Sequence, residues 1–360
     1  MSWIPDGVVE HLRAVAGAPD LSGTKYQLVS RLARGGMGTV YLAYDAQLDR
    51  HVALKVLDLP DASNELEARM MREARIVARL AHPGIVPIHD VGALPDGRVF
   101  YSMKLVHGNR LDEYVKKGAA LADMLRVFQK ACQAVAFAHA NSVIHRDLKP
   151  ENIMVGAFGE VLVMDWGLAK ILPLASSPSD GKNINGQTTA DASTTPILHA
   201  RFSDERSHET LHGTVLGTPA YMAPEQARGE IENLDRRTDV YALGAILTYL
   251  LRSYSSADND RNNLAQGRDL QKPLARMRKI PKALTAICAK AMAADKPARY
   301  PDALDLASDI ERFLDGLSVS SYKENPFEIV WRWLKQYRFI VLLVLVYMLV
   351  RIALFFLFRR

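Results

Sequence analysis

One short run of residues combines an acid, a cation and a carboxamide at a spacing that suits phosphoryl transfer. This run is the octapeptide HRDLKPEN at positions 145–152. The carboxylate of Asp147 can accept the proton of an attacking hydroxyl group, and the ammonium group of Lys149 can neutralise charge on the moving phosphoryl group. The carboxamide oxygen of Asn152 can bind a magnesium ion, and Asp165, in a turn of sequence DWG, offers a second oxygen ligand. These residues predict a metal-assisted phosphotransfer site.

A lysine in an apolar run adds a second cation to this set. Lys55 lies within the run VALKV at 52–56, where a charge needs a partner. Glu73, on the helix predicted next along the chain, is the expected partner. Glu65 and Glu67 are alternatives, but they lie nearer the start of that helix, where a solvated carboxylate complements the helix dipole.

The elements that must position these residues change in character along the chain. Residues 26–57 alternate β-branched and aromatic residues with turns, and 99–105 has a similar composition, which is typical of strands. Elsewhere apolar residues recur at three- and four-residue steps, which is typical of amphipathic helices. Helices are predicted at 65–80, 121–141, 239–251, 284–293 and 303–314. The pattern predicts an α+β fold with a strand-rich first part and a mainly helical second part.

These motifs, in this order, resemble those of eukaryotic-type (Hanks-type) protein kinases of the serine/threonine class, most of all the bacterial membrane-anchored kind. The resemblance implies a bilobal protein kinase fold over residues 25–317, with a strand-rich N-lobe at about 25–106 and a helical C-lobe at about 107–317. Residues 1–24 then form an N-terminal extension. Residues 174–211 are rich in polar residues and lack apolar periodicity, so we predict a disordered insertion within the activation segment.

The resemblance also implies where ATP binds. Residues 32–40 match the family's glycine-rich loop, in which glycines let backbone amides approach the phosphates. Ala33 replaces the first glycine of the family pattern, a mild departure. Val40 and Ala53 are expected to cover the adenine ring, with Met103 behind it. The expected ATP-binding residues are Leu32, Ala33, Arg34, Gly35, Gly36, Met37, Gly38, Thr39, Val40, Ala53, Lys55, Met103, Lys104, Val106 and Met154.

By the same resemblance, the chemistry-bearing residues take defined roles. The expected catalytic residues are Asp147, Lys149, Asn152, Lys55 and Glu73. The expected ligands of Mg²⁺ (or Mn²⁺) are Asn152 and Asp165. Trp166 stands where the family usually has Phe, so a larger ring must pack against the helix that bears Glu73.

The sequence around the catalytic acid implies a substrate class. Lys149 and the run GTPAYMAPE at 217–225 match the serine/threonine pattern of the family rather than the tyrosine-directed one. Within that run, Thr218 is expected to orient the catalytic acid and Lys149. Glu225 is expected to form a buried ion pair with Arg299.

Two further residues are expected to support the catalytic run. Asp239, which opens an apolar helix, would brace the backbone around His145 and Arg146. In relatives an arginine such as Arg146 often binds a phosphate on the activation segment, so Arg146 could hold a phosphorylated hydroxyl residue. The candidate phosphorylation sites are Ser207, Thr210 and Thr214. The alternative is that these hydroxyl groups only keep a loop soluble.

The C-terminal part of the chain is strongly apolar. Residues 339–358 contain one charge, Arg351. Twenty residues in a helix extend about 30 Å, the thickness of a bilayer's hydrocarbon core. Trp331, Trp333 and Tyr337 precede the run, as aromatic residues do at a membrane interface. We expect a juxtamembrane segment at 318–338 and a single-pass transmembrane helix at 339–358, with the kinase domain on the cytoplasmic side where ATP is present. A helix lying on the membrane surface is the alternative.

Composition narrows the class of protein. Of 360 residues, 49% are hydrophobic, enough for a sizeable core, and the net charge of +5 is modest. Part of the basic excess lies near the C-terminus, which favours a lipid bilayer over nucleic acid as a partner. Cys132 and Cys288 are far apart in helical patterns, so we expect reduced thiols. The first residues lack the pattern of a signal peptide.

The predicted function is ATP-dependent phosphorylation of Ser and Thr hydroxyls on proteins, including the chain itself, and a homodimer would allow phosphorylation in trans. A nucleotide-binding pseudokinase scaffold would lack a key residue, but Lys55, Glu73, Asp147, Asn152 and Asp165 are all present. A small-molecule phosphotransferase on a related fold would lack the Ala-Pro-Glu element at 223–225 and its partner Arg299, both of which the sequence contains.

Overall fold

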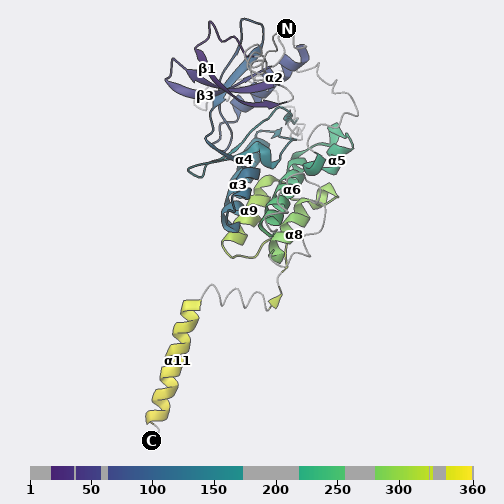
Figure 1. Cartoon of the computed structure of the whole chain (residues 1–360). Coiled ribbons are helices and arrows are strands. Elements are labelled where there is room, and N and C mark those ends of the chain that lie inside the picture. The colour runs from purple at the N-terminus through teal and green to yellow at the C-terminus, as the bar shows by residue number, and fades with distance from the viewer. Residues whose placement is uncertain are drawn as a thin grey trace, which may run out of the picture.

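A computed structural model describes residues 18–35, 38–57, 64–172, 219–255, 280–323, 325–326 and 338–358 of the chain (Figure 1). Several predictions fall outside these residues. They concern residues 1–17 of the N-terminal extension, Gly36, Met37, the insertion at 174–211, Thr218, the hydroxyl residues Ser207, Thr210 and Thr214, and most of the juxtamembrane segment at 318–338.

The first lobe is built on a five-stranded antiparallel sheet of strand order β1-β2-β3-β5-β4. Its strands are β1 (Tyr26–Gly35), β2 (Gly38–Asp45), β3 (Arg50–Val56), β4 (Ile88–Ala93) and β5 (Val99–Lys104). Successive side chains of a strand point to opposite faces, and both faces of this sheet carry apolar residues. One face buries Tyr41, Val52, Leu54 and Phe100 in a cluster of its own, which leaves the other face for a helix.

Helix α2 (Asn64–Arg79) covers that second face (Figure 1). Met70 and Ala74 of α2 pack with Ala53 and Tyr101 of the sheet. Positions three and four apart in a helix share one face, so Glu73 lies on the buried side of α2 together with Met70 and Ala74. The prediction of a helix at 65–80 agrees with α2 to within one residue at each end.

The second lobe is mainly helical (Figure 1). Its described helices are α3 (Leu111–Lys116), α4 (Leu121–Ala140), α5 (Pro224–Ala227), α6 (Arg236–Ser255), α8 (Lys282–Ala291) and α9 (Ala303–Leu314). Helix α6 is buried on all sides from Thr238 to Ser253, as expected for a helix that is apolar all round. It approaches α8 closely at Gly244, where an added Cβ atom would lie 2.7 Å from the Cβ atom of Ala291.

Short strands of the second lobe hold the catalytic run in place. Strand β7 (Val143–Ile144) pairs with β10 (Lys170–Ile171), and β6 (Gly108–Arg110), β8 (Ile153–Gly156) and β9 (Val161–Val163) form a three-stranded sheet. The octapeptide therefore leaves β7 and ends in a 3₁₀ turn that leads directly into β8. The metal-binding turn predicted at Asp165 follows β9.

A further helix among the described residues, α11 (Arg338–Phe358), has 21 residues. Large apolar side chains along it are exposed, among them Leu343, Leu345 and Leu349. Among the residues that the structure describes, no helix combines the length and the apolar character needed to cross a membrane. The structure therefore gives no support to the transmembrane span predicted at 339–358.

Candidate active site

Residues from both lobes meet at the predicted phosphotransfer site. Lys55 lies in β3, opposite Val40 of β2 and Tyr101 of β5. Its ammonium nitrogen lies 2.9 Å from Oε1 and 3.1 Å from Oε2 of Glu73. Glu73 is 3% exposed, so the pair is shielded from water. The structure therefore brings Lys55 together with Glu73. Glu67, one of the two alternatives, is only partly buried, and the side chain of Glu65 is outside the described part.

The charges around Lys55 favour its ammonium form. Burial opposes this charge, but the acidic groups of Tyr101, Glu73 and Asp165 outweigh burial and raise the pKa of Lys55 above its ordinary value. The Lys55 nitrogen lies 3.5 Å from Oδ1 of Asp165. Lys55 is thus a cation held between two carboxylates, at the place where phosphate groups are expected.

Tyr101 is a site residue that the sequence analysis missed. Its hydroxyl group donates a hydrogen bond of 2.7 Å to Oε1 of Glu73, and the Lys55 nitrogen lies 5.5 Å from the centre of its ring. The signal that could have found it is the alternation of β5, which places Tyr101 two residues before Met103 and therefore on the same face of the sheet. Met103 was predicted to face the nucleotide, so Tyr101 had to face the same space.

Asp165 is presented by a turn whose backbone is unusual. Its φ angle is +58°, in the left-handed region, and its side chain is 46% exposed. Burial raises the pKa of this carboxyl, but Lys55, His145 and Lys149 outweigh burial and hold the pKa below its usual value. Asp165 is therefore ionised at neutral pH, as a metal ligand must be.

Trp166 anchors this turn. It is 1% exposed, and its ring packs against that of His145 with the ring centres 4.6 Å apart. Its indole N–H donates a hydrogen bond of 3.3 Å to the carbonyl oxygen of Val163. The phenylalanine usual at this position in the family has no such donor, so Trp166 adds a polar attachment between the turn and β9.

Within the octapeptide, the acid and the cation are already paired. The Lys149 nitrogen lies 2.8 Å from Oδ2 of Asp147. The carboxamide N–H of Asn152 donates to the backbone carbonyl oxygen of Asp147 over 2.8 Å, which leaves the carboxamide oxygen of Asn152 available for a metal. The backbone N–H of Met164 donates to the carbonyl oxygen of Asn152, so the segment that bears Asp165 runs beside Asn152.

The oxygen donors of Asp165 and Asn152 fit magnesium better than a metal whose ligands all come from protein side chains. The described residues hold no group of three or more His, Cys, Asp or Glu side chains that could bind a metal. Magnesium is usually held by one or two protein oxygens together with waters and phosphate oxygens of the substrate. A carboxylate at Asp165 and a carboxamide oxygen at Asn152 form such a set.

Asp239 of α6 holds the backbone of the octapeptide by hydrogen bonds. Its Oδ2 accepts from the backbone N–H of His145 (2.8 Å), and its Oδ1 accepts from that of Arg146 (2.9 Å). His139 of α4 contacts the same carboxylate at 2.8 Å. Burial raises the pKa of Asp239, but the bond to His139 and further contacts lower it overall, so the brace stays charged. Arg146 adopts a φ angle of +68° at this point.

Glu225 and Arg299 form a buried ion pair in the second lobe. Two nitrogens of Arg299 lie 2.8 and 2.9 Å from the two carboxylate oxygens of Glu225, and the Thr238 hydroxyl group donates to the same carboxylate at 3.1 Å. Arg299 also donates to the carbonyl oxygen of Ala293 at 2.8 Å. The pair fastens the end of the activation segment to the helices.

The structure brings the predicted adenine-binding side chains together. Ala53, Met103 and Leu162 belong to one buried cluster, against which Val40 and Val106 pack. Met154 lies opposite Leu162 in the β8–β9 ladder, next to this cluster. By contrast, the described glycine-loop residues Leu32, Ala33, Arg34 and Gly35 are exposed, and so is Lys104. Thr39 is buried, and a side chain at Gly38 would collide with the carbonyl group of Val56.

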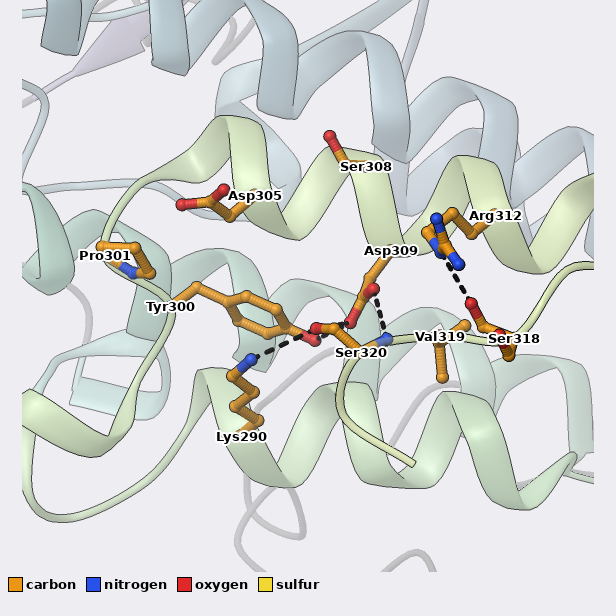
Figure 2. Close-up of a pocket in the computed structure, with 10 residues that line it drawn as sticks. All are labelled: Lys290, Tyr300, Pro301, Asp305, Ser308, Asp309, Arg312, Ser318, Val319 and Ser320. Atoms are coloured by element: carbon orange, nitrogen blue, oxygen red, sulfur yellow. Dashed lines mark hydrogen bonds between the residues drawn. The ribbon is translucent and has the colours of Figure 1, made fainter. Parts of the chain in front are cut away.

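A cavity of about 440 Å³ lies elsewhere, between α8, α9 and residues 318–320 (Figure 2). There Tyr300 donates a hydrogen bond of 2.7 Å to Oδ2 of the buried Asp309. The backbone N–H and the hydroxyl group of Ser320 also donate to Asp309, over 2.7 and 2.8 Å. None of the residues that line this cavity belongs to the predicted phosphotransfer site.

Comparison with known proteins finds similar chains among serine/threonine-protein kinases. A serine/threonine-protein kinase PknD of Protochlamydia amoebophila (strain UWE25) is 35% identical over 319 residues, which cover 81% of this chain and 30% of that protein. PknD of Chlamydia felis (strain Fe/C-56) is 34% identical over 309 residues, with 81% and 31% covered. The chain thus spans about a third of the length of these curated relatives.

A solved structure shows the same fold. The crystal structure of the Mycobacterium tuberculosis PknI kinase domain matches with a TM-score of 0.55 at 23% identity, covering 82% of this chain and 98% of that one. The family model described as the protein kinase domain matches residues 26–317, most of the chain. The chain therefore belongs to the protein kinase family.

Proposed function

We propose that the chain is an ATP-dependent protein kinase that transfers the γ-phosphoryl group of ATP to Ser and Thr hydroxyls of proteins. The observation that carries the proposal is the contact of Lys55 with Glu73, next to Asp165 and in a chain that also pairs Asp147 with Lys149. Protein kinases need the lysine–glutamate ion pair and the metal-binding aspartate in place at the same time. The printed names of the relatives, serine/threonine-protein kinases, support the class of hydroxyl acceptor.

Each residue has a defined task in such a transfer. Asp147 accepts the proton of the incoming hydroxyl group, while Lys149, 2.8 Å away, compensates charge that develops on the phosphoryl group. Lys55 binds the α- and β-phosphates, and Glu73 fixes the direction of its ammonium group. Asn152 and Asp165 would hold Mg²⁺ or Mn²⁺. Such a metal would neutralise charge on the triphosphate.

The alternative functions are less well supported. A pseudokinase scaffold does not need a paired Lys55 and Glu73 together with an ionised Asp165, and all three are present. A small-molecule phosphotransferase on a related fold does not need the element at 223–225, which here is tied into the core through Glu225 and Arg299. The first observation favours an active enzyme, and the second favours a protein substrate.

The proposal is tested by incubating the purified chain with radioactive ATP, Mg²⁺ and a degenerate peptide library, followed by phosphoamino acid analysis. We expect label on serine and threonine. Label on tyrosine alone would contradict the assigned substrate class. Absence of any labelled polypeptide from protein that is folded and binds nucleotide would leave the pseudokinase as the better description.

We also propose that the chain phosphorylates itself at Ser207, Thr210 or Thr214. Support comes from Arg146, to which the family resemblance gives a phosphate-binding role, and from the nearby cation Lys170. Burial and the charge of Arg146 lower the pKa of Lys170, so the two cations lie close enough to repel each other. A phosphate bound near them would offset this repulsion. Mass spectrometry after incubation with ATP should find phosphate on at least one of the three residues. The proposal fails if all three residues stay unmodified in active protein. If one copy of the chain phosphorylates another, the initial rate of autophosphorylation should rise with the square of the protein concentration.

Finally, we propose that residues 339–358 attach the chain to the cell membrane as a single pass, with the kinase domain in the cytoplasm. The proposal rests on the twenty-residue run with one charge, on the exposed apolar side chains of α11, and on the basic residues Arg332, Lys335 and Arg338 before the run. The full chain should sediment with membranes and resist extraction at alkaline pH, whereas a variant ending at residue 337 should be released. Extraction of the full chain at alkaline pH would instead indicate a helix on the membrane surface.

A further inference from the structure

The contact between Tyr101 and Glu73 is a buried hydrogen bond to a carboxylate, which packing of the tyrosine ring in the core does not require. Tyr101 is 4% exposed and Glu73 is 3% exposed, so their 2.7 Å hydrogen bond is screened from water. A hydrogen bond to an ionised group is about twice as strong as one between neutral groups. The bond joins β5 of the sheet to α2, beside the packing of Met70 and Ala74 against Tyr101.

The same carboxylate oxygen receives two donors. Oε1 of Glu73 accepts from the Tyr101 hydroxyl group and from the Lys55 ammonium group, at 2.7 and 2.9 Å. A buried ion pair repays the loss of hydration only when further hydrogen bonds satisfy its remaining lone pairs. Tyr101 supplies such a bond, and its ring lies within cation–π distance of Lys55. Tyr101 therefore stabilises both members of the pair.

The register of the sheet explains why this residue can do so. Lys55 of β3 lies directly opposite Tyr101 of β5, and Ala53 lies opposite Met103. Residues opposite each other in an antiparallel ladder project to the same face, here the face covered by α2. A tyrosine at position 101 therefore reaches past Lys55 to the helix, while a shorter side chain could not.

We propose that Tyr101 is a positioning residue for phosphoryl transfer. Its hydroxyl group holds Glu73, and with it α2, against Lys55. This inference rests on the proposed kinase activity, because its functional consequence is the correct placement of Lys55 on the phosphates. A residue that only filled the core would act through its ring and would be replaced by phenylalanine without effect on turnover.

The test compares Tyr101→Phe with Tyr300→Phe in the full chain. Both substitutions remove one hydroxyl group that donates a 2.7 Å bond to a buried carboxylate, and Tyr300 lies at the distant cavity (Figure 2). We expect Tyr101→Phe to lower kcat for peptide phosphorylation by about three- to tenfold, with a smaller change in KM for ATP. Tyr300→Phe should leave kcat within about twofold of the wild type, whatever it does to thermal stability.

A double-mutant cycle shows whether the effect passes through Glu73. In a Glu73→Met background the acceptor of the bond is gone, so adding Tyr101→Phe should change the residual kcat by less than about twofold. Multiplication of the two effects, or a Tyr101→Phe variant as active as Tyr300→Phe, would overturn the proposal.

Amide hydrogen exchange of α2 tests the role of Tyr101 without a measurement of catalysis. In nucleotide-free protein, the amides of α2 should exchange about tenfold faster in Tyr101→Phe than in the wild type or in Tyr300→Phe. Equal exchange rates in all three proteins would refute a positioning role. If the wild type transfers no phosphate but α2 still loosens in Tyr101→Phe, the proposed function fails while the contact stands.

Discussion

Replacing Asp147 by asparagine is expected to reduce kcat for peptide phosphorylation by about 100- to 10,000-fold, the contribution typical of a positioned general base. The carboxamide cannot accept the hydroxyl proton, and it loses the ionic attraction of Lys149. The hydrogen bond from Asn152 reaches the backbone oxygen of residue 147 and is retained. We therefore expect a folded protein whose KM for ATP changes little, measured by steady-state peptide phosphorylation.

The matched control for this variant is Asp123→Asn. Asp123 is exposed and pairs with Arg126 on the surface of α4, so the same chemical change there should leave kcat unaltered. An Asp147→Asn protein that keeps more than about a tenth of wild-type kcat would show that Asp147 is not the base. Nucleotide binding by both variants confirms that the protein is intact.

Replacing Arg299 by alanine is expected to lower the free energy of unfolding by about 3–5 kcal/mol, because Glu225 would remain buried without its counter-charge. Arg299 is fully buried and makes bonds to both oxygens of Glu225 and to the carbonyl oxygen of Ala293. Urea denaturation of the wild type and the variant measures the difference. The exposed pair of Arg228 and Glu230 offers the control, since Arg228→Ala should leave the urea midpoint unchanged.

The loss at Arg299 should depend on pH in a defined direction. Burial raises the pKa of Glu225, but the bonds and charge of Arg299, together with hydrogen bonds from the backbone and Thr238, outweigh burial and lower that pKa below its ordinary value of 4.5. A group whose pKa is lowered in the folded state stabilises the protein above its unfolded pKa and loses this contribution as pH falls. The difference between wild type and Arg299→Ala should therefore shrink as the pH falls below 4.5 towards the lower pKa of Glu225 in the folded protein. A difference that stays constant down to acid unfolding would mean that packing of Arg299, not its charge, stabilises the fold.

Much of the site could be predicted from sequence because its chemistry is concentrated in short runs. The octapeptide carries Asp147, Lys149 and Asn152 within six residues, so their proximity follows from chain connectivity alone. Lys55 and Glu73 are only 18 residues apart in the sequence, and the apolar run around Lys55 shows that its charge must be compensated. Local sequence thus contained the information for these contacts.

Contacts that depend on strand register could not be predicted in the same way. Tyr101 is 46 residues from Lys55, and nothing local shows which residue of β5 lies opposite it. His139 is a similar case, because its contact with Asp239 requires the packing of α4 against α6 across 100 residues of chain. Helix α6 begins at Arg236, three residues before its predicted start, because its polar first turn lacks the apolar signal on which the prediction relied.

The left-handed backbone conformation of Arg146 and Asp165 implies a trade-off between the stability of the fold and catalytic activity. A non-glycine residue in this region carries about 1–2 kcal/mol of conformational strain that glycine would not. Selection for robustness alone would therefore favour glycine at both positions, at the expense of the guanidinium and the carboxylate. In a homologue that no longer needs catalytic activity, substitution of these two residues by glycine would raise stability and abolish activity. We therefore expect glycine at positions 146 and 165 to be among the first changes in such a homologue.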